Sequence, residues 1–364
     1  MEMNVHFDSE RYQALKQTYR QWWGGSLERP IVPVITTGHE SRLDPSRYPQ
    51  MTFANAWDES IAPEEFIEHD DAVFSAMRFH GDAFPMTLPI KLGAGVLAAL
   101  LGCKPVSSEH TVWCLPEKEV PIEALHFEYT EDTPAFKRLM RYYEAAMEKW
   151  QGRVVLGMFD LGGVMDVLAS FRGTENLLMD LYDDPEEVLR CVKEIQELWF
   201  RYFDRFNRLL APHVPGYSHW YGIYHEEPGY ILQSDFCYMI SPEMFNTFVG
   251  PELDSSAKRL WNAVYHMDGV GQIPHLEYLL QMEGIKGYQW QPGDGTARTK
   301  NWDALNLRIL DAGKKLISLE PDEAGNLPEL YHRYLPQLLL PNRCFHADDM
   351  ANARAYAQKY GVSI

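Results

Sequence analysis

The chain has few cysteines, and they are not arranged as a disulfide framework would require. No two of them form a Cys-x-x-Cys pair, and five is an odd number. Without a secretory pattern, such cysteines are expected to stay reduced inside the cell. They are Cys103, Cys114, Cys191, Cys237 and Cys344.

Long hydrophobic runs are also absent. No run of about 18 apolar residues occurs, so the sequence predicts no membrane-spanning helix. The first residues, MEMNVHFDSERYQ, are polar and acidic and lack the apolar core of a signal peptide. Together these absences predict a cytoplasmic protein that has no membrane partner.

Basic residues are scarce relative to acidic ones. The chain has 33 Lys and Arg against 52 Asp and Glu, which gives a formal net charge of −19. A surface this acidic repels nucleic acid and anionic membranes, so neither is expected as a partner. A small anionic ligand is still compatible with it, because one local pocket can be basic. Nothing in the composition distinguishes a monomer from a homodimer.

The sequence contains neither a Gly-x-Gly-x-x-Gly turn nor a phosphate-binding loop with a lysine, which are the usual reasons to prefer an open doubly wound sheet. Instead, strands alternate with helices, and this pattern predicts a parallel sheet covered on both faces. We expect an α/β fold in which residues 1–364 form a single (β/α)8 TIM barrel, with residues 1–28 as an N-terminal helical extension. An open doubly wound sheet is the alternative. The expected strands include 31–35, 110–115 (at an edge), 153–159, 216–223, 262–266, 285–290, 315–320 and 342–346.

One of these strands ends in a pattern suited to chemistry. In the stretch 262–271 an apolar run ends at His266, and Asp268 follows just before Gly269 and Gly271. The period of two along a strand places His266 and Asp268 on the same face. The glycines allow the backbone to turn sharply directly afterwards. Both side chains can bind a metal or carry a proton, although a His-x-Asp pair also occurs often by chance.

The chemistry of a barrel of this kind lies at the carboxyl ends of its strands. A zinc-type metal takes nitrogen, sulfur and carboxylate ligands and keeps an open position when it is catalytic. His266 and Asp268 would supply two ligands. We expect the third from Cys344 or His346, because barrel closure brings the last strand round to the first.

Other strand ends provide candidates for the remaining roles. Three acids are expected to position substrate or move a proton; they are Asp160, Asp235 and Glu320. Three aromatic residues are expected to line a pocket for a flat or apolar substrate; they are Tyr221, Tyr224 and Trp290. Structural roles compete with these assignments, because an aspartate can cap the next helix and aromatic rings can simply pack at the barrel top.

Several segments resemble the uroporphyrinogen decarboxylase superfamily. The resemblance covers roughly residues 150–360 well and the first part of the chain only loosely. It implies a (β/α)8 barrel that is either a porphyrin decarboxylase or a zinc-dependent methyltransferase, which passes methyl groups to or from a corrinoid protein or a thiol. The segments are QSDFCYMISPEMF at 233–245 with Pro251-Glu252-Leu253, FDLGG at 159–163 with Asp184-Pro185-Glu186, and YHMDG at 265–269.

Two departures from the family pattern decide between these activities. The decarboxylases carry an arginine-rich segment after the first strand to hold several carboxylates, whereas residues 34–40 here read VITTGHE. The methyltransferases bind zinc through His-x-Cys and a distant Cys, and here Asp268 stands at the first cysteine position. An oxygen ligand makes a harder metal, which suits an ether, amine or hydroxyl.

The residues and the resemblance lead to one main hypothesis. We expect a zinc-dependent, methyltransferase-like enzyme that moves a methyl group between a small O- or N-methylated substrate and a corrinoid (cobalamin) on a partner protein. One alternative is a metal-free decarboxylase or lyase acting on a small carboxylated compound, with His266 and Asp268 as an acid–base pair. The other is a non-catalytic ligand-binding barrel.

Overall fold

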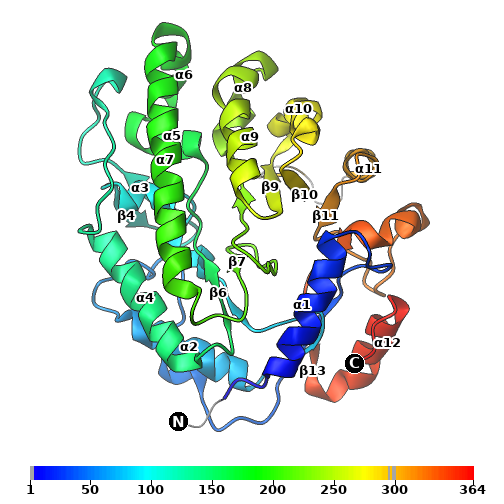
Figure 1. Cartoon of the computed structure of the whole chain (residues 1–364). Helices are drawn as coiled ribbons and strands as arrows, with labels where there is room; N and C mark the ends of the chain where they lie inside the picture. The colour runs from blue at the N-terminus through cyan, green and yellow to red at the C-terminus, as the bar shows by residue number, and fades with distance from the viewer. Residues whose placement is uncertain (1–3, 294–295, 297–300) are drawn as a thin grey trace.

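Strands and helices alternate along the chain in the computed structural model, which describes residues 4–293, 296 and 301–364 (Figure 1). The strands are β1 (Pro33–Thr37), β2 (Arg78–Gly81), β3 (Met86–Thr87), β4 (Lys104–Ser107), β5 (Val112–Leu115), β6 (Val155–Met158), β7 (Ser218–His219), β8 (Ile231–Leu232), β9 (Ala263–Asp268), β10 (Ile285–Gln291), β11 (Lys315–Ile317), β12 (Leu338–Leu339) and β13 (Arg343–His346).

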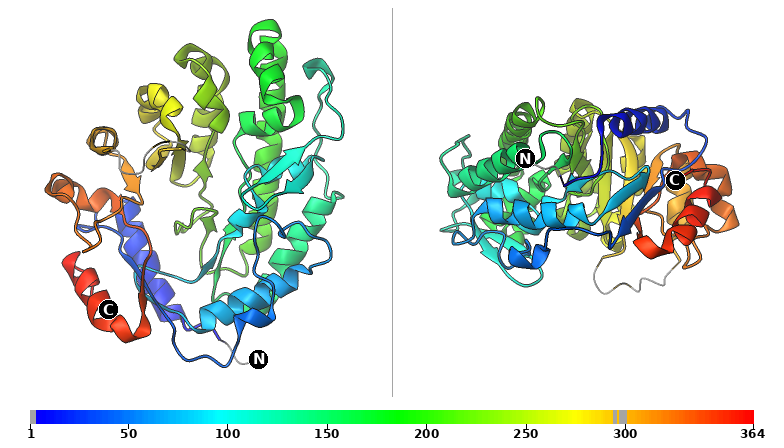
Figure 2. Two further views of the ribbon diagram at one scale, coloured as in Figure 1. Left: turned by 180° about the vertical axis from the view of Figure 1, so that it is seen from behind. Right: turned by 90° about the horizontal axis from the view of Figure 1, so that it is seen from below.

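The helices follow one another around the outside of the strands, and Figure 2 shows this arrangement from behind and from below. The α-helices are α1 (Ser9–Trp23), α2 (Pro63–Ser75), α3 (Val96–Leu100), α4 (Pro134–Trp150), α5 (Val164–Arg172), α6 (Thr174–Asp183), α7 (Pro185–Leu210), α8 (Pro242–Phe248), α9 (Gly250–Arg259), α10 (Leu276–Gln281), α11 (Asp303–Asp311) and α12 (Met350–Lys359). Short 3-10 helices are η1 (Pro45–Arg47), η2 (Pro89–Leu92), η3 (Ile122–Ala124), η4 (Asp235–Met239), η5 (Val270–His275), η6 (Glu329–Gln337) and η7 (Ala347–Asp349).

The strands are mostly parallel, as the alternation predicts. β8, β9, β10, β11 and β12 form one five-stranded sheet, and all of its pairings are parallel. β3, β6 and β7 form a second parallel sheet, and β1 lies between β13 and β2 in a third. β4 and β5 make a separate antiparallel hairpin, so the predicted edge strand at 110–115 is present as β5.

The last strands of the chain lie beside the first. Ile31 bridges to Leu339 of β12, and a few residues later β1 pairs in parallel with β13. Only Leu340, Pro341 and Asn342 separate β12 from β13. Proline has no backbone donor, and its position here explains why one edge is divided into two short strands. This contact joins the five-stranded sheet to β1, as expected for a barrel.

The ring of strands is not continuous, however. The strands fall into four sheets. The antiparallel β2 occupies the other edge of β1, so β1 does not pair with β3, and within the described residues β7 does not pair with β8. The predicted single closed (β/α)8 barrel is therefore confirmed only as an α/β fold built on parallel strands. Strands of different sheets still face a common interior, since one small cavity of about 40 Å³ is lined from β1, β3 and β12 by Pro33, Met86 and Leu339.

The predicted strand at 216–223 is wrong in extent. Only Ser218 and His219 pair, as β7, and the chain then turns at Gly222, which has φ +88°. Tyr217 and His225 bridge antiparallel across this turn. The strand that continues the five-stranded sheet is β8, which was not among the expected strands. Its two residues are too few for an alternation to be visible in the sequence.

The N-terminal extension contains the expected helix, α1, while residues 1–3 lie outside the described part of the chain. Asp8 caps α1 by accepting a hydrogen bond from Arg11 N at 2.9 Å. Its buried face meets the core through Tyr19, whose ring contacts Phe84 and Tyr224.

Of the helices that the structure describes, none is both long enough and apolar enough to cross a membrane.

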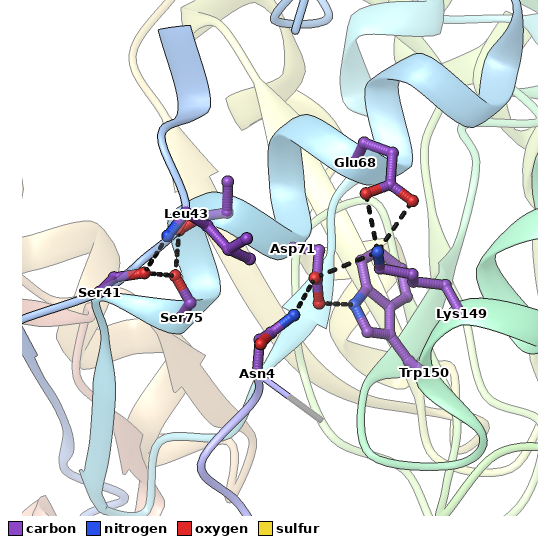
Figure 3. A network of polar contacts seen from close by, with 9 residues as sticks. Asn4, Ser41, Leu43, Glu68, Asp71, Ser75, Lys149 and Trp150 are labelled. Atoms are coloured by element: carbon purple, nitrogen blue, oxygen red, sulfur yellow. Dashed lines mark hydrogen bonds and ion pairs between the residues drawn. The ribbon is translucent and has the colours of Figure 1, made fainter. Parts of the chain in front are cut away.

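A buried aspartate fastens α2 to α4 and to the N-terminal segment (Figure 3). Asp71 is 1% exposed and accepts hydrogen bonds from Asn4 Nδ2 at 2.8 Å and from Trp150 Nε1 at 3.0 Å. Lys149 Nζ lies 3.3 Å from Asp71 Oδ2 and also forms an ion pair with Glu68, which is more exposed than Asp71. The negative charge is thus satisfied on every side by donors from two other segments.

Replacing Asp71 should destabilise the protein far more than replacing Glu68. Asp71→Ala leaves two buried donors and a partly buried ammonium without their partner, so we expect a loss of about 3 kcal/mol in the free energy of unfolding. Glu68→Ala removes a half-exposed partner of the same lysine and should cost less than about 1 kcal/mol. Urea unfolding of both variants measures this, and equal losses would show that the network adds nothing beyond a surface ion pair.

Candidate metal centre

His266 and Asp268 lie where the sequence places them, at the carboxyl end of β9. Tyr265 and Met267, which alternate with them, point into the core and are fully buried. The two polar side chains are only partly buried and share the opposite face, with His266 Nε2 3.8 Å from Asp268 Oδ2. Gly269 follows with φ +88°, and a Cβ there would lie 2.7 Å from the ring of Tyr238. A side chain is therefore excluded at this turn.

Asp235 completes a group of three potential metal ligands. One ligand atom from each of Asp235, His266 and Asp268 lies within 4.8 Å of the others, and this is the only such group of three or more among the described residues. Asp235 opens η4, directly after β8, and β8 pairs with β9. The group is thus assembled by the ends of two neighbouring parallel strands. A cavity of about 260 Å³ opens beside Asp235 and Asp268.

Asp166 holds the backbone that carries Asp235. Its two carboxylate oxygens accept hydrogen bonds from Asp235 N at 3.0 Å and Phe236 N at 2.7 Å. Asp166 lies in the first turn of α5, so it connects the helix after β6 to the end of β8. Gly163 makes this approach possible, because a Cβ there would stand 2.3 Å from both Asp166 Oδ2 and Gln233 O.

Gln289 on β10 fixes the orientation of the His266 ring. The two residues are directly opposite in the β9–β10 register, and Gln289 Oε1 is hydrogen-bonded to His266 Nδ1. Gln289 Nε2 donates to the carbonyl of Trp290 at 3.0 Å, which leaves Oε1 as the atom that faces the imidazole. His266 Nδ1 is therefore the donor, and Nε2 is turned toward the carboxylates. The edge of Trp220 closes another side of the ring at 5.2 Å between centroids.

With the ring in this orientation, electrostatics favour a positive charge between His266 Nε2 and the two carboxylates. If only Nδ1 is protonated, the lone pair of His266 Nε2 faces two carboxylates and is repelled by them. Burial alone would lower the pKa of His266, but the contact with Asp268 and the charge of Asp235 outweigh it and raise the pKa. Either a proton on Nε2 or a metal ion between the three groups would relieve the repulsion.

The three donors fit a divalent metal ion. Catalytic zinc sites use three protein ligands from histidine and carboxylate and leave a position open for substrate. The hydrogen bond from His266 Nδ1 to Gln289 is the outer contact that metal-binding histidines generally make. Asp235, which we expected to act on substrate or a proton, is thus the third member of this possible metal-binding group, a place for which we expected Cys344 or His346.

Cys344 and His346 lie apart from this group. Both are exposed residues of β13, and β13 pairs with β1 rather than with β9. His346 Nδ1 instead lies 3.3 Å from Asp348 Oδ2. Barrel closure does bring the last strand to the first, as expected, but in the described sheets β10 and β11 separate β9 from the last strands.

Asp160 is a buried carboxyl beside the metal centre. It is 4% exposed and accepts hydrogen bonds from Gly162 N at 2.8 Å and from Gln233 Nε2 at 3.4 Å. Burial, reinforced by the charge of Asp235, raises its pKa to about 7, although the bond from Gly162 acts against this. Asp160 can therefore hold a proton near neutral pH, which a free aspartate does not.

The other predicted residues occupy different surroundings. Glu320 is exposed after β11. Tyr221 is partly buried, and its pKa is raised by burial against opposing hydrogen bonds from Ser318 and Gln289. Trp290 is partly buried and packs on Trp302 at 5.0 Å between centroids. Tyr224 is fully buried and donates its hydroxyl to Pro215 O at 2.9 Å, so its surroundings are those of a core residue.

Sequence reasoning missed two residues that build the site. Asp166 was visible as an aspartate in the first turn of the helix after a strand, but its partner is the backbone some 70 positions away. Gln289 could be recognised only once the register between β9 and β10 placed it opposite His266. In both cases the signal is a tertiary contact rather than a local pattern.

The buried state of Asp160 makes stability depend on pH. Between the ordinary aspartate pKa near 4 and the folded value of about 7, the folded protein keeps a proton that the unfolded chain has lost. This contribution to stability therefore falls as the pH rises through that range. Asp160→Asn lacks the titration, so its unfolding free energy relative to the wild type should increase by about 2 kcal/mol between pH 5 and pH 8.

Chemical denaturation at both pH values measures this difference. Asp132→Asn is a suitable control, because Asp132 has a side chain that is 95% exposed, and its difference from the wild type should not change with pH. A constant difference for Asp160→Asn as well would contradict the raised pKa.

Comparison with solved structures supports the fold. The chain is similar to a methyltransferase from Methanosarcina mazei, with a TM-score of 0.57 and 14% sequence identity over 94% of this chain and 97% of that chain. No family model matches the sequence, and no curated protein matches it either. At this identity the similarity shows a shared fold, so the activity has to be argued from the site.

Proposed function

We propose that the chain is a zinc-dependent, methyltransferase-like enzyme related to the uroporphyrinogen decarboxylase superfamily and its (β/α)8 barrel. It would move a methyl group between a small O- or N-methylated substrate and a corrinoid on a partner protein. The observation that carries the proposal is the convergence of Asp235, His266 and Asp268 at the carboxyl ends of β8 and β9. The similar fold of the Methanosarcina mazei methyltransferase supports it.

Each residue of the centre has a role in this proposal. Asp235, His266 and Asp268 hold the metal, Gln289 orients the imidazole and Asp166 positions Asp235. A bound zinc ion would supply Lewis acidity toward the oxygen or nitrogen that carries the methyl group. Asp160, whose pKa of about 7 lets it carry a proton, is proposed to donate that proton to the oxygen or nitrogen that loses the methyl group.

The mouth of the site suits a protein partner. Trp113, Leu115 and Met239 line a cavity that Asp235 also lines, and they are 65%, 49% and 47% exposed. Tyr238, beside the smaller cavity, is 48% exposed. Large apolar side chains left uncovered around a site commonly mark a docking surface. We propose that the corrinoid protein docks here, which would bring its cobalt to the substrate.

Metal content tests the centre directly. The purified chain, dialysed against zinc and then against buffer, should retain about one zinc ion per chain, and His266→Ala should retain none. Gln289→Leu should keep the site but bind zinc about 10- to 100-fold more weakly, because the imidazole loses its outer contact. Elemental analysis and competition with a chelating dye measure both quantities.

His346→Ala and Cys344→Ala are the matched controls, since the structure places these residues outside the group. Both should keep the zinc affinity of the wild type. Loss of zinc in either control, or an unchanged zinc content in His266→Ala, would overturn the assignment of ligands.

Methyl transfer can be followed without the partner protein. Reduced free cobalamin mixed with the zinc-loaded chain and a panel of O- and N-methylated compounds should be converted to methylcobalamin by at least one compound. His266→Ala should abolish this conversion, and His346→Ala should not. Absorption spectra of the cobalamin report the reaction, and spectra that stay unchanged across the panel would argue against a methyltransferase.

A second function is favoured by one observation. Asp160 and Asp166 both have pKa values raised to about 7, mainly by burial, so the site can hold protons without any metal. This suits a metal-free lyase or decarboxylase acting on a small carboxylated compound. Release of carbon dioxide from such compounds by zinc-free protein, unaffected by added zinc, would favour this function over methyl transfer.

A further inference from the structure

A second cavity opens next to the metal centre. Its volume is about 490 Å³, within the range of sites that hold small molecules. Asp235 lines this cavity as well as the smaller one beside Asp268, so the two adjoin at a proposed metal ligand. A molecule in the larger cavity would therefore reach the metal centre at Asp235.

Three elements that are distant in the sequence form the walls. The β5 segment contributes Trp113 and Leu115, α5 contributes Ala169, and η4 contributes Phe236 and Met239. Trp113 and Met239 are about half exposed or more, so their apolar surfaces are free to contact a ligand. Such walls suit the hydrocarbon part of a small organic molecule.

The charges of this cavity all have one sign. Its lining includes the carboxyl groups of Glu119, Asp166 and Asp235, and it includes no lysine, arginine or histidine. The overall acidity of the chain does not explain why this lining has no basic residue, because another cavity of the chain has several. A separate cavity of about 600 Å³ at the start of α4 is lined by four basic residues, Lys104, Lys137, Arg138 and Arg141.

Glu119 is available to pair with a ligand. Among the described residues, no hydrogen bond or ion pair engages the Glu119 carboxylate. Its charge acts on Arg172, but the guanidinium of Arg172 is held by Asp180 at 2.6 and 3.1 Å. Asp166 holds the backbone of Asp235, and Asp235 is a proposed metal ligand, whereas Glu119 is exposed in the lining of the cavity and has neither role. A cation in this space would have both the Glu119 carboxylate and the Trp113 indole in the lining around it.

We propose that this cavity selects a substrate that carries a positively charged ammonium group, held by Glu119 and Trp113. This inference rests on the proposed function, because it names the substrate class of the same site. Carboxylates attract an ammonium ion, and an indole ring adds a cation–π contact. A carboxylated or phosphorylated molecule would meet only like charges here. The methyl-bearing atom would lie toward Asp235.

The test compares two probes of the same shape. Choline and 3,3-dimethylbutan-1-ol differ in that a quaternary nitrogen in one is a carbon in the other. Calorimetric titration of the full chain should show choline binding at least about tenfold more tightly than the neutral alcohol. Glutarate, a dianion, should not bind to the same cavity and should not displace choline.

Two substitutions connect binding to the proposed residues. Glu119→Gln and Trp113→Ala should each weaken choline binding by about three- to tenfold. Glu117→Gln is the matched control, because Glu117 lies two positions away but lines the separate cavity at α4, and it should leave choline affinity unchanged.

The proposal is overturned if choline and the alcohol bind equally, if neither binds, or if glutarate binds in place of choline. It is also overturned if Glu119→Gln and Glu117→Gln have the same affinity for choline. These readouts do not depend on zinc or on methyl transfer. Choline selectivity in a chain that retains no zinc would therefore refute the metal-dependent function while supporting an ammonium-binding cavity.

Discussion

The turn of His266 Nε2 toward two carboxylates is the constraint on which the site depends. Gln289 Oε1 accepts a hydrogen bond from His266 Nδ1, so the ring can donate from Nε2 to Asp235 or Asp268 only as the charged, doubly protonated imidazolium. A proton on His266 Nε2 or a metal ion in this space would remove the repulsion between the lone pair of Nε2 and the carboxylates. Which of the two is present separates the two functions that the site supports.

The fold provides this arrangement through strands that are short but firmly held. β9 is buried between β8 and β10, so the position of His266 is set by backbone pairing on both sides. Asp235 needs a further anchor, because β8 has only two residues, and Asp166 supplies it from α5. The hydrogen bonds that Asp166 accepts also hold Asp235 in the lining of the larger cavity. Metal binding and substrate selection would therefore share one structural support.

Much of this could be predicted from residues that are local in sequence. The alternation from β9 to β13 predicted parallel strands, and the His-x-Asp pattern with its glycine exit predicted two members of the metal group. The third member, Asp235, could not be predicted as part of this group. β8 is too short to show a period, and sheet order rather than chain order decides which strand ends meet. Cys344 and His346 illustrate this: they lie in the last strand, β13, as expected, yet β13 pairs with β1 rather than with β9.

Anomalous diffraction from crystals grown with zinc tests the central claim most directly. Data collected on the two sides of the zinc absorption edge should give one strong peak within bonding distance of Asp235, His266 and Asp268, and no peak at His346. A crystal of His266→Ala should lose that peak. Absence of the peak in the wild type, with the three side chains in the same positions, would contradict the metal centre.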